Sequence, residues 1–226
     1  MFGRNPKLPP EFFDGKVLKV HSIFYTIQGE GPYSGRPAVF IRLSGCNLAC
    51  SFCDTEFDLY ESLELEQILD RVRDVCRVSN RNLNKRMLIV ITGGEPFRQR
   101  IGMLCDLLIK SNFEVHIETN GLLYNEIPNE VHVICSPKNN GNGYYKIRDD
   151  VLRHTVGIKF IVSSSLEGYS NIAEVGQSEI GVPVYVQPMD EYDEEKNRSN
   201  INLAIEIAMK NNAMFSMQLH KIVGME

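Results

Sequence analysis

Three of the six cysteines lie close together, with the spacing of metal ligands rather than that of a disulfide framework. Cys46, Cys50 and Cys53 form a CxxxCxxC pattern in a loop that follows an apolar run. Three thiolates can bind three irons of a four-iron four-sulfur cluster, which leaves the fourth iron open for chemistry. A structural zinc site needs a fourth ligand, and the nearby candidates, Asp54 and His21, are poorly placed for that role. The spacing therefore favours an iron–sulfur cluster over zinc or a disulfide.

Five polar or glycine-rich motifs, the cysteine loop among them, come directly after strand-like runs. In parallel α/β folds, ligand sites form at the carboxyl ends of the strands. Because the motifs lie at the carboxyl ends of neighbouring strands, they are predicted to line one cavity. They occupy residues 45–55, 92–96, 119–121, 136–138 and 187–190.

The elements that position these motifs alternate between strand and helix, which is typical of βα units around a parallel sheet. Strand-like runs occupy residues 17–26, 38–43, 87–91, 114–118, 131–134, 157–162, 183–187 and 214–219. Apolar residues at helical spacing predict three helices whose buried faces belong to the core. These faces comprise Leu65, Ile68, Leu69, Val72 and Cys76; Ile101, Leu104, Cys105 and Leu108; and Ile201, Ala204, Ile205 and Met209. The charged run at residues 190–198 predicts a solvated loop or a helix entry.

The length of 226 residues and the lack of a linker or repeat favour one domain. A complete eightfold α/β barrel typically takes about 250 residues, and this chain also holds a cofactor loop near its start. We therefore predict a single-domain α/β fold, an incomplete β/α barrel with the active site at the C-terminal ends of its parallel strands. Residues 1–15, rich in proline and phenylalanine, form an N-terminal extension without an assigned role, and residues 16–226 form the core domain.

Composition excludes several classes of function. Twenty-four basic against 29 acidic side chains give a net charge of −5, so the basic footprint of a nucleic-acid-binding protein is missing. The apolar runs are far shorter than the roughly 18 to 20 residues that span a bilayer, and no signal-peptide core precedes them. The sequence predicts a cytoplasmic protein that binds neither nucleic acid nor membrane.

The cysteine loop, with Phe52 directly before its third cysteine, resembles that of the radical S-adenosylmethionine superfamily. The sequence TGGEP at residues 92–96 resembles the second motif of that superfamily, although a GGE by itself is only a tight turn. The resemblance implies that the open iron binds the amino and carboxylate groups of the methionine moiety. It further implies that an electron from the reduced cluster splits the sulfonium to give a 5′-deoxyadenosyl radical.

Longer segments resemble the 7-carboxy-7-deazaguanine synthases of queuosine biosynthesis. The resemblance implies a carbon–nitrogen lyase that contracts the ring of 6-carboxy-5,6,7,8-tetrahydropterin to 7-carboxy-7-deazaguanine with loss of ammonia. It implies a 4Fe-4S cluster, S-adenosyl-L-methionine and Mg2+ as cofactors, a homodimer, and a flavodoxin-type electron donor. The matching segments are residues 24–32, 35–42, 53–55, 118–121, 136–138, 187–190 and 218–221.

The resemblance also implies roles for individual residues. The metal ligands are Cys46, Cys50 and Cys53 for the cluster and Thr55 for Mg2+. The residues implied for S-adenosylmethionine are Phe52, Cys53, Asp54, Gly93, Gly94, Glu95, Ser136, Pro137, Lys138, Gln187, Pro188, Met189 and Asp190. Those implied for the substrate are Ile27, Gln28, Gly29, Glu30, Arg42, Thr92, His220 and Glu226. No residue is assigned as a protein radical, an acid or a base.

Physical chemistry supports several of these roles and leaves alternatives open. The planar guanidinium of Arg42 suits two-point binding of a carboxylate, but a buried salt bridge is an alternative. Gln28 and Glu30 suit the hydrogen-bonding edge of a pterin, but lie in a Gly/Pro-rich segment that would otherwise be a solvated turn.

The remaining roles have alternatives of the same kind. Thr55 offers a hard oxygen to Mg2+, beside an Asp54 that can orient a bound water, or the pair forms a turn or helix cap. Lys138 is alternatively a surface lysine, and His220 a core histidine. The other cysteines, Cys76, Cys105 and Cys135, are predicted to pack as small apolar side chains.

Two other functions remain open at this point. One is a different radical S-adenosylmethionine enzyme, such as a glycyl-radical activase, which usually carries further ferredoxin-like cysteines. The other is a metal-bearing structural module that docks a partner. Some relatives also carry an insert in the cysteine loop that this chain lacks, so the surroundings of Mg2+ need not be the same.

Overall fold

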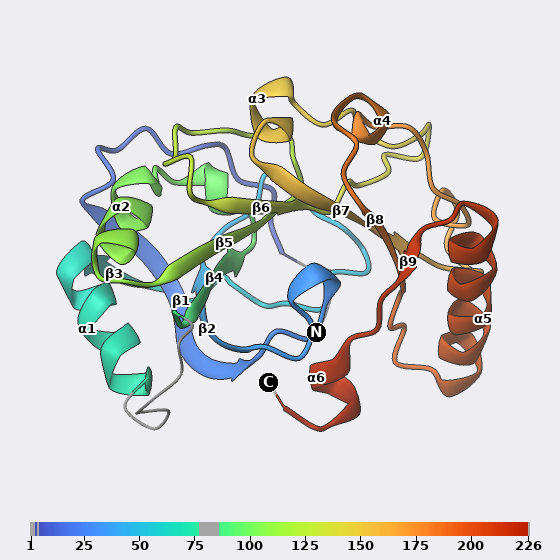
Figure 1. Ribbon diagram of the computed structural model, residues 1–226, viewed down its shortest axis with the longest axis horizontal. Coiled ribbons are helices and arrows are strands. Elements are labelled where there is room, and N and C mark those ends of the chain that lie inside the picture. Colours follow the sequence, from blue (N-terminus) through green and yellow to red (C-terminus); the bar gives the residue numbers. More distant parts are fainter. Residues whose placement is uncertain (1–2, 4, 77–85, 226) are drawn as a thin grey trace.

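A curved sheet of nine strands organises the part of the chain that the computed structural model describes, namely residues 3, 5–76 and 86–225 (Figure 1). The strand order is β3-β1-β2-β4-β5-β6-β7-β8-β9. Neighbouring strands from β2 to β9 are parallel, so their carboxyl ends share one edge. The strands are β1 (Val17–Ile27), β2 (Pro37–Leu43), β3 (Glu61–Glu64), β4 (Leu88–Gly93), β5 (Glu114–Thr119), β6 (His132–Cys135), β7 (Thr155–Val162), β8 (Val184–Pro188) and β9 (Met214–Phe215).

The first strand departs from the predicted parallel arrangement. Strand β1 runs antiparallel to β2 and to β3. The sequence did not predict β3, because only Leu63 of its four residues is buried and so short a strand shows no alternation. The predicted last strand is also too long, since β9 ends at Phe215 and a helical turn begins at Leu219.

The longer helices lie outside the curve of the sheet, with α1 and α2 against its first half and α5 against its end (Figure 1). They confirm the three predicted helices. The sheet remains open, as expected for a partial barrel, and α6 lies near the opening. The helices are α1 (Leu65–Cys76), α2 (Gly102–Lys110), α3 (Asp149–Leu152), α4 (Gln177–Ile180), α5 (Glu194–Lys210) and α6 (Leu219–Ile222), with 3-10 turns η1 (Gly31–Tyr33) and η3 (Pro96–Arg98). Within the described residues, no helix is long and apolar enough to cross a membrane.

The predicted core faces of α1 and α2 are largely confirmed. Ile68, Leu69 and Val72 of α1 are buried, and so are all four predicted residues at the start and face of α2. Leu65 and Cys76 are partly buried and pack against the same core. Cys105 and Cys135 are fully buried in that core, as predicted for small apolar side chains.

The predicted face of α5 is partly wrong. Ile205 is 40% exposed and Met209 is 80% exposed. The buried stripe instead consists of Asn200, Ala204, Ile207 and Ala208. A search for apolar side chains misses it because its first member is a polar residue.

Candidate active site

One cavity of about 400 Å³ lies at the carboxyl ends of the parallel strands. All five motifs that follow strand-like runs contribute to its lining, which confirms the predicted shared cavity. Of the implied site residues, the ones that line it are Ile27, Gln28, Glu30, Arg42, Cys46, Cys50, Phe52, Cys53, Asp54, Thr55, Thr92, Gly93, Gly94, Ser136, Lys138, Gln187, Pro188, Met189, Asp190 and His220.

Four implied site residues are not part of this lining. Gly29, Glu95 and Pro137 lie next to lining residues in the sequence but do not line the cavity themselves. Glu226 lies outside the described residues. The cavity therefore brings together most of the implied site.

The three cysteines of the loop are free thiols on the cavity wall. Burial raises the pKa of all three thiols, that of Cys46 to about 12. The backbone amide of Leu48 donates to the sulfur of Cys46 over 3.4 Å. Metal binding to such a loop therefore displaces protons as the thiolates form.

The donor set of the loop is three cysteines, which suits a cluster in which each cysteine binds a different iron. Among the described residues, no group of three or more His, Cys, Asp or Glu side chains is placed to hold one metal ion. A zinc ion needs all its sulfur ligands about 2.3 Å from one centre, whereas each cysteine of an iron–sulfur cluster binds a different iron. His21, the distant zinc candidate, instead makes a 2.7 Å contact between its Nδ1 and the carbonyl oxygen of Leu59.

The TGGEP turn packs directly against the start of the cysteine loop. A Cβ atom on Gly94 would lie 2.1 Å from the carbonyl oxygen of Gly45, and one on Gly93 would lie 2.1 Å from that of Leu43. Gly93 also has a φ of +135°, which side chains rarely tolerate. Only glycines at these two positions allow the second motif to lie against the first.

The Glu95 side chain joins the TGGEP turn to neighbouring segments behind the cavity wall. Its fully buried carboxylate accepts hydrogen bonds from Thr119 Oγ1 at 2.7 Å, Asn120 N at 2.8 Å and Phe97 N at 3.0 Å. Burial raises the pKa of Glu95 to about 7, against the opposing effect of these donors. The contacts join the ends of β4 and β5, so Glu95 shapes the site through its neighbours.

A group of charged side chains forms the opposite part of the cavity. The Lys159 ammonium contacts the Glu30 carboxylate and lies 3.5 Å from that of Glu118. Gln28 Nε2 donates to Glu118 over 2.9 Å, and Gln218 Nε2 donates to Glu30 over 2.8 Å. Burial raises the pKa of Glu30, but Lys159 and the hydrogen bond from Gln218 together lower it below its usual value. Burial lowers the pKa of Lys159, but the carboxylates of Glu118 and Glu30 raise it above its usual value. The group has two acidic members and one basic member.

The sequence interpretation missed Lys159 and used Glu118 only as part of a motif. A signal for Lys159 was present, because it is the single charged residue in the mostly apolar strand β7. A charged side chain on a buried strand needs partners. Here the partners come from β5 and from the segment after β1, far away in sequence.

Arg42 and Thr92 lie side by side at the ends of β2 and β4, where they are register partners. Both line the cavity. The Arg42 guanidinium carbon lies 5.1 Å from the centre of the Phe24 ring, a cation–π contact. The pair therefore presents a flat cation and a hydroxyl to the interior.

The segment around α6 closes one side of the cavity. Lys221 Nζ lies 2.9 Å from a carboxylate oxygen of Asp54 and 2.9 Å from one of Asp190, so it joins the cysteine loop to the loop after β8. Thr55 Oγ1 contacts the other oxygen of Asp54 at 3.3 Å. Asp54 and Thr55 precede no helix, which excludes the helix-cap alternative.

The α6 segment can pack against Gly29 because glycine has no side chain. Its carbonyl oxygen accepts from Leu219 N over 3.0 Å. A Cβ on Gly29 would lie 2.0 Å from Nδ1 of His220. The histidine ring thus comes close to the backbone of the Gln28–Glu30 turn only because residue 29 is glycine.

Lys138 is partly buried and held by neighbours, rather than the free surface lysine of the alternative interpretation. Its ammonium donates to the carbonyl oxygen and the hydroxyl of Ser136, both over 2.7 Å. Burial lowers its pKa, although the nearby Cys50 opposes this shift. Lys138 is thus held beside the cysteine loop by the turn after β6.

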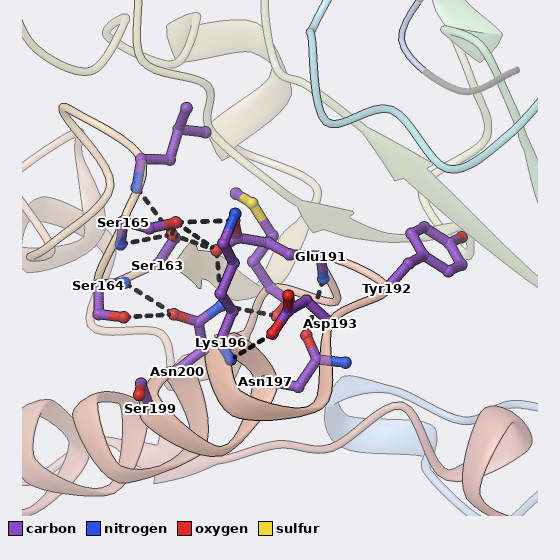
Figure 2. A network of polar contacts seen from close by, with 12 residues as sticks. Ser163, Ser164, Ser165, Glu191, Tyr192, Asp193, Lys196, Asn197, Ser199 and Asn200 are labelled. Carbon is purple, nitrogen blue, oxygen red and sulfur yellow. Dashed lines mark hydrogen bonds and ion pairs between the residues drawn. The ribbon is translucent and has the colours of Figure 1, made fainter.

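A dense polar network supports the loop after β8 from outside the cavity (Figure 2). Glu191 accepts hydrogen bonds from Ser163 at 2.7 Å, from Ser165 at 2.7 Å and from Asn200 at 2.9 Å. Asn200, which is fully buried, also donates to the carbonyl oxygen of Met189 over 3.0 Å.

The same network continues to the cavity lining. Asn200 Oδ1 accepts from the amide and the hydroxyl of Ser164, and Asn197 Nδ2 donates to Asp190 over 2.8 Å. The predicted solvated loop or helix entry at residues 190–198 is confirmed, because residues 192–196 and 198 are exposed and only Asp190, Glu191 and Asn197 are partly buried. It becomes helical at Glu194, with Asp193 as the cap.

Comparison with known proteins agrees with this geometry. Residues 40–138 match the Radical SAM superfamily. The chain is 49% identical over 226 residues to a 7-carboxy-7-deazaguanine synthase from Rickettsia prowazekii, covering 100% of this chain and 96% of that protein. It is 33% identical to a 7-carboxy-7-deazaguanine synthase from Rhodospirillum rubrum, covering 99% of each. The crystal structure of QueE from Escherichia coli is similar with a TM-score of 0.68 and 26% identity, covering 90% of this chain and 95% of that one.

The partial barrel and its cysteine-bearing cavity therefore define a radical S-adenosylmethionine enzyme, which implies a 4Fe-4S cluster and S-adenosylmethionine. Within this class, the chain belongs to the 7-carboxy-7-deazaguanine synthase family. The comparisons do not favour a glycyl-radical activase.

Proposed function

We propose that this enzyme converts 6-carboxy-5,6,7,8-tetrahydropterin into 7-carboxy-7-deazaguanine with loss of ammonia. The observation that carries the proposal is the single cavity that joins a three-cysteine loop to a charged wall of Arg42, Glu30 and Lys159. Such a wall suits a ligand with a carboxylate at one end and a polar heterocyclic edge at the other.

The cysteine side of the cavity would hold the cluster and S-adenosylmethionine. Cys46, Cys50 and Cys53 would each hold one iron, and a bound, reduced cluster would supply the electron for the reductive cleavage of S-adenosylmethionine. The residues proposed to hold S-adenosylmethionine include Gly93 and Gly94, whose backbones lie on the cavity wall. The others are Phe52, Asp54, Glu95, Ser136, Pro137, Lys138, Gln187, Pro188, Met189 and Asp190.

The opposite side would hold the pterin. Arg42 binds the substrate carboxylate through its planar fork. Gln28, Glu30 and His220 meet the heterocycle, and Glu30 keeps free acceptor positions for this because a carboxylate accepts about four hydrogen bonds. Ile27, Gly29, Thr92 and Glu226 are the remaining residues proposed for the substrate.

Thr55 is proposed as a ligand of Mg2+. It lines the cavity beside Asp54 and supplies one neutral oxygen. Mg2+ usually keeps waters and shares ligands with its substrate. The ion is therefore expected to bind together with the pterin rather than to the protein alone.

A cytoplasmic location, a homodimer and a flavodoxin-type donor are part of the same proposal. The dimer and the donor rest on the family resemblance, and the location rests on the short apolar runs of the sequence. Size-exclusion chromatography with light scattering tests the dimer, and reduction of the cluster by flavodoxin tests the donor.

The deciding experiment is a turnover assay. Reconstituted protein is incubated anaerobically with reductant, S-adenosylmethionine, Mg2+ and the carboxytetrahydropterin, and the product is analysed by mass spectrometry. We expect 7-carboxy-7-deazaguanine. Cleavage of S-adenosylmethionine without this product would keep the radical chemistry but contradict the substrate.

A further inference from the structure

The segment before β1 lies along the cysteine loop. Gly3 N donates to the carbonyl oxygen of Cys53 over 3.0 Å, and Leu8 N donates to that of Cys46 over 2.7 Å. A β-bridge pairs Lys7 with Cys46. The segment therefore contacts the first and the last cysteine of the loop through its backbone.

Asn5 contributes a side chain to the same contact. Its carboxamide nitrogen donates to the carbonyl oxygen of Thr55 over 2.7 Å and to the sulfur of Cys53 over 3.5 Å. A carboxamide carries two N–H donors, so both bonds can form at once. Asn5 is only 9% exposed, which keeps water from competing for these bonds.

The far end of the segment is fixed to the body of the protein. Glu11 forms ion pairs with Arg98 and with Lys19, and its amide donates to the Arg98 carbonyl oxygen over 2.7 Å. Arg98 is 3% exposed and also donates to the carbonyl oxygen of Pro9. Its guanidinium packs against Gly45, directly before Cys46. The segment is therefore held at both ends of its contact with the loop.

From this geometry we propose that Asn5 is a positioning residue that raises the reduction potential of the cluster through its hydrogen bond to Cys53. The segment around it, Gly3 with residues 5–11, anchors the cysteine loop. Hydrogen bonds to the sulfur ligands and solvent exposure both tune the potential of an iron–sulfur cluster. Reduction adds one electron whose charge spreads onto the sulfurs, so an N–H donor stabilises the reduced state more than the oxidised one. This gives the N-terminal extension a function, and it rests on the cluster assigned above.

The test is the midpoint potential of the reconstituted cluster, followed by electron paramagnetic resonance in wild type and in Asn5→Leu. Leucine has nearly the shape of asparagine but no donor. We expect the ratio of reduced to oxidised cluster at a fixed potential to fall about threefold, a shift of about 28 mV to more negative values for one electron. The rate of iron release to a chelator should rise as well.

Leu8→Ala is the matched control, because Leu8 lies in the same segment and donates to Cys46 from its backbone amide, which alanine keeps. It should keep the wild-type potential. An unchanged potential in iron-replete Asn5→Leu would overturn the proposal.

If Asn5→Leu binds less iron, Asn5→Gln is compared, since it keeps the amide. Recovered iron with a wild-type potential supports the proposal, and an equal loss of iron overturns it. Failure of the proposed function looks different, because wild-type protein would then bind no cluster or form no deazaguanine.

Discussion

Two walls of the cavity are held in different ways. The cysteine wall, residues 45–55, has neither helix nor strand and depends on contacts with the TGGEP turn, Lys221 and the N-terminal segment. The braced wall, residues 187–191, is fixed by the buried network of Glu191 and Asn200 (Figure 2). The cysteine wall has no regular structure of its own, so a bound cluster would add more to its support than to that of the braced wall.

The largest expected effect comes from the cysteine wall. Replacing Cys50 by Ala should abolish cluster binding and activity, because each thiolate is the sole protein ligand of one iron. Iron content and visible absorption after reconstitution measure the effect. Cys76→Ala, on the outer helix α1, should bind a full cluster, and full iron content in Cys50→Ala would contradict the assignment.

The braced wall should respond through stability instead. Asn200→Ala removes the acceptor of Ser164 and the donor to Met189 and Glu191. Met189 is buried, and a buried group left unpaired costs about 1 to 3 kcal/mol. We expect a drop of about 2 to 3 kcal/mol in the free energy of unfolding, measured by urea titration. Affinity for S-adenosylmethionine should fall as well, while iron content stays normal.

Ser199→Ala serves as the control on the same helix, since its hydroxyl bonds only within α5, to the carbonyl oxygen of Glu195. Wild-type stability in Asn200→Ala would show that the network does not brace the wall.

Arg42 lies on strand β2, which leads into the cysteine wall. Because it belongs to neither wall, a substitution there tests substrate binding separately from the two walls. Arg42→Lys keeps the charge but loses the two-point contact with a carboxylate. The substrate affinity should fall roughly ten- to hundredfold, or about 1 to 3 kcal/mol. Isothermal titration with the pterin measures the change, and an unaltered affinity would favour a structural ion pair.

Thr55 should give the smallest effect. Mg2+ should tighten pterin binding and the pterin should tighten Mg2+ binding by the same factor, because coupled binding is reciprocal. Thr55→Ala should reduce this factor roughly three- to tenfold and leave the iron content unchanged. The measurement is pterin affinity with and without Mg2+ in both proteins. Equal pterin affinities with and without Mg2+ in wild type would contradict the proposed role of Mg2+.

The cysteine wall could be predicted from sequence because its chemistry is local. The spacing of Cys46, Cys50 and Cys53 alone indicates a cluster, and the strand before them sets their place on the rim. The glycines of the TGGEP turn are visible in the same way. These features depend on neighbours in the chain.

The charged group and the braced wall could not be predicted in this way. Lys159 meets Glu30 and Glu118 only because of how β7, β5 and the end of β1 lie in the barrel. Asn200 occupies a helix face that apolar periodicity assigns to other residues, Ile205 and Met209. Such contacts depend on tertiary packing, which a pattern of local spacing does not contain.

The closure by α6 has a consequence for the order of folding. Gln218 meets Glu30 across 188 positions of sequence, and Ser216 meets Gly31 across 185. Closing so long a loop costs conformational entropy before the contact stabilises anything. Strands β1, β2 and β4 can pair first. The part of the cavity around Glu30 is complete only when the segment around α6 has packed against the turn after β1. The ability to bind pterin therefore reports the completion of folding, and α6 should exchange its amide hydrogens sooner than the central strands.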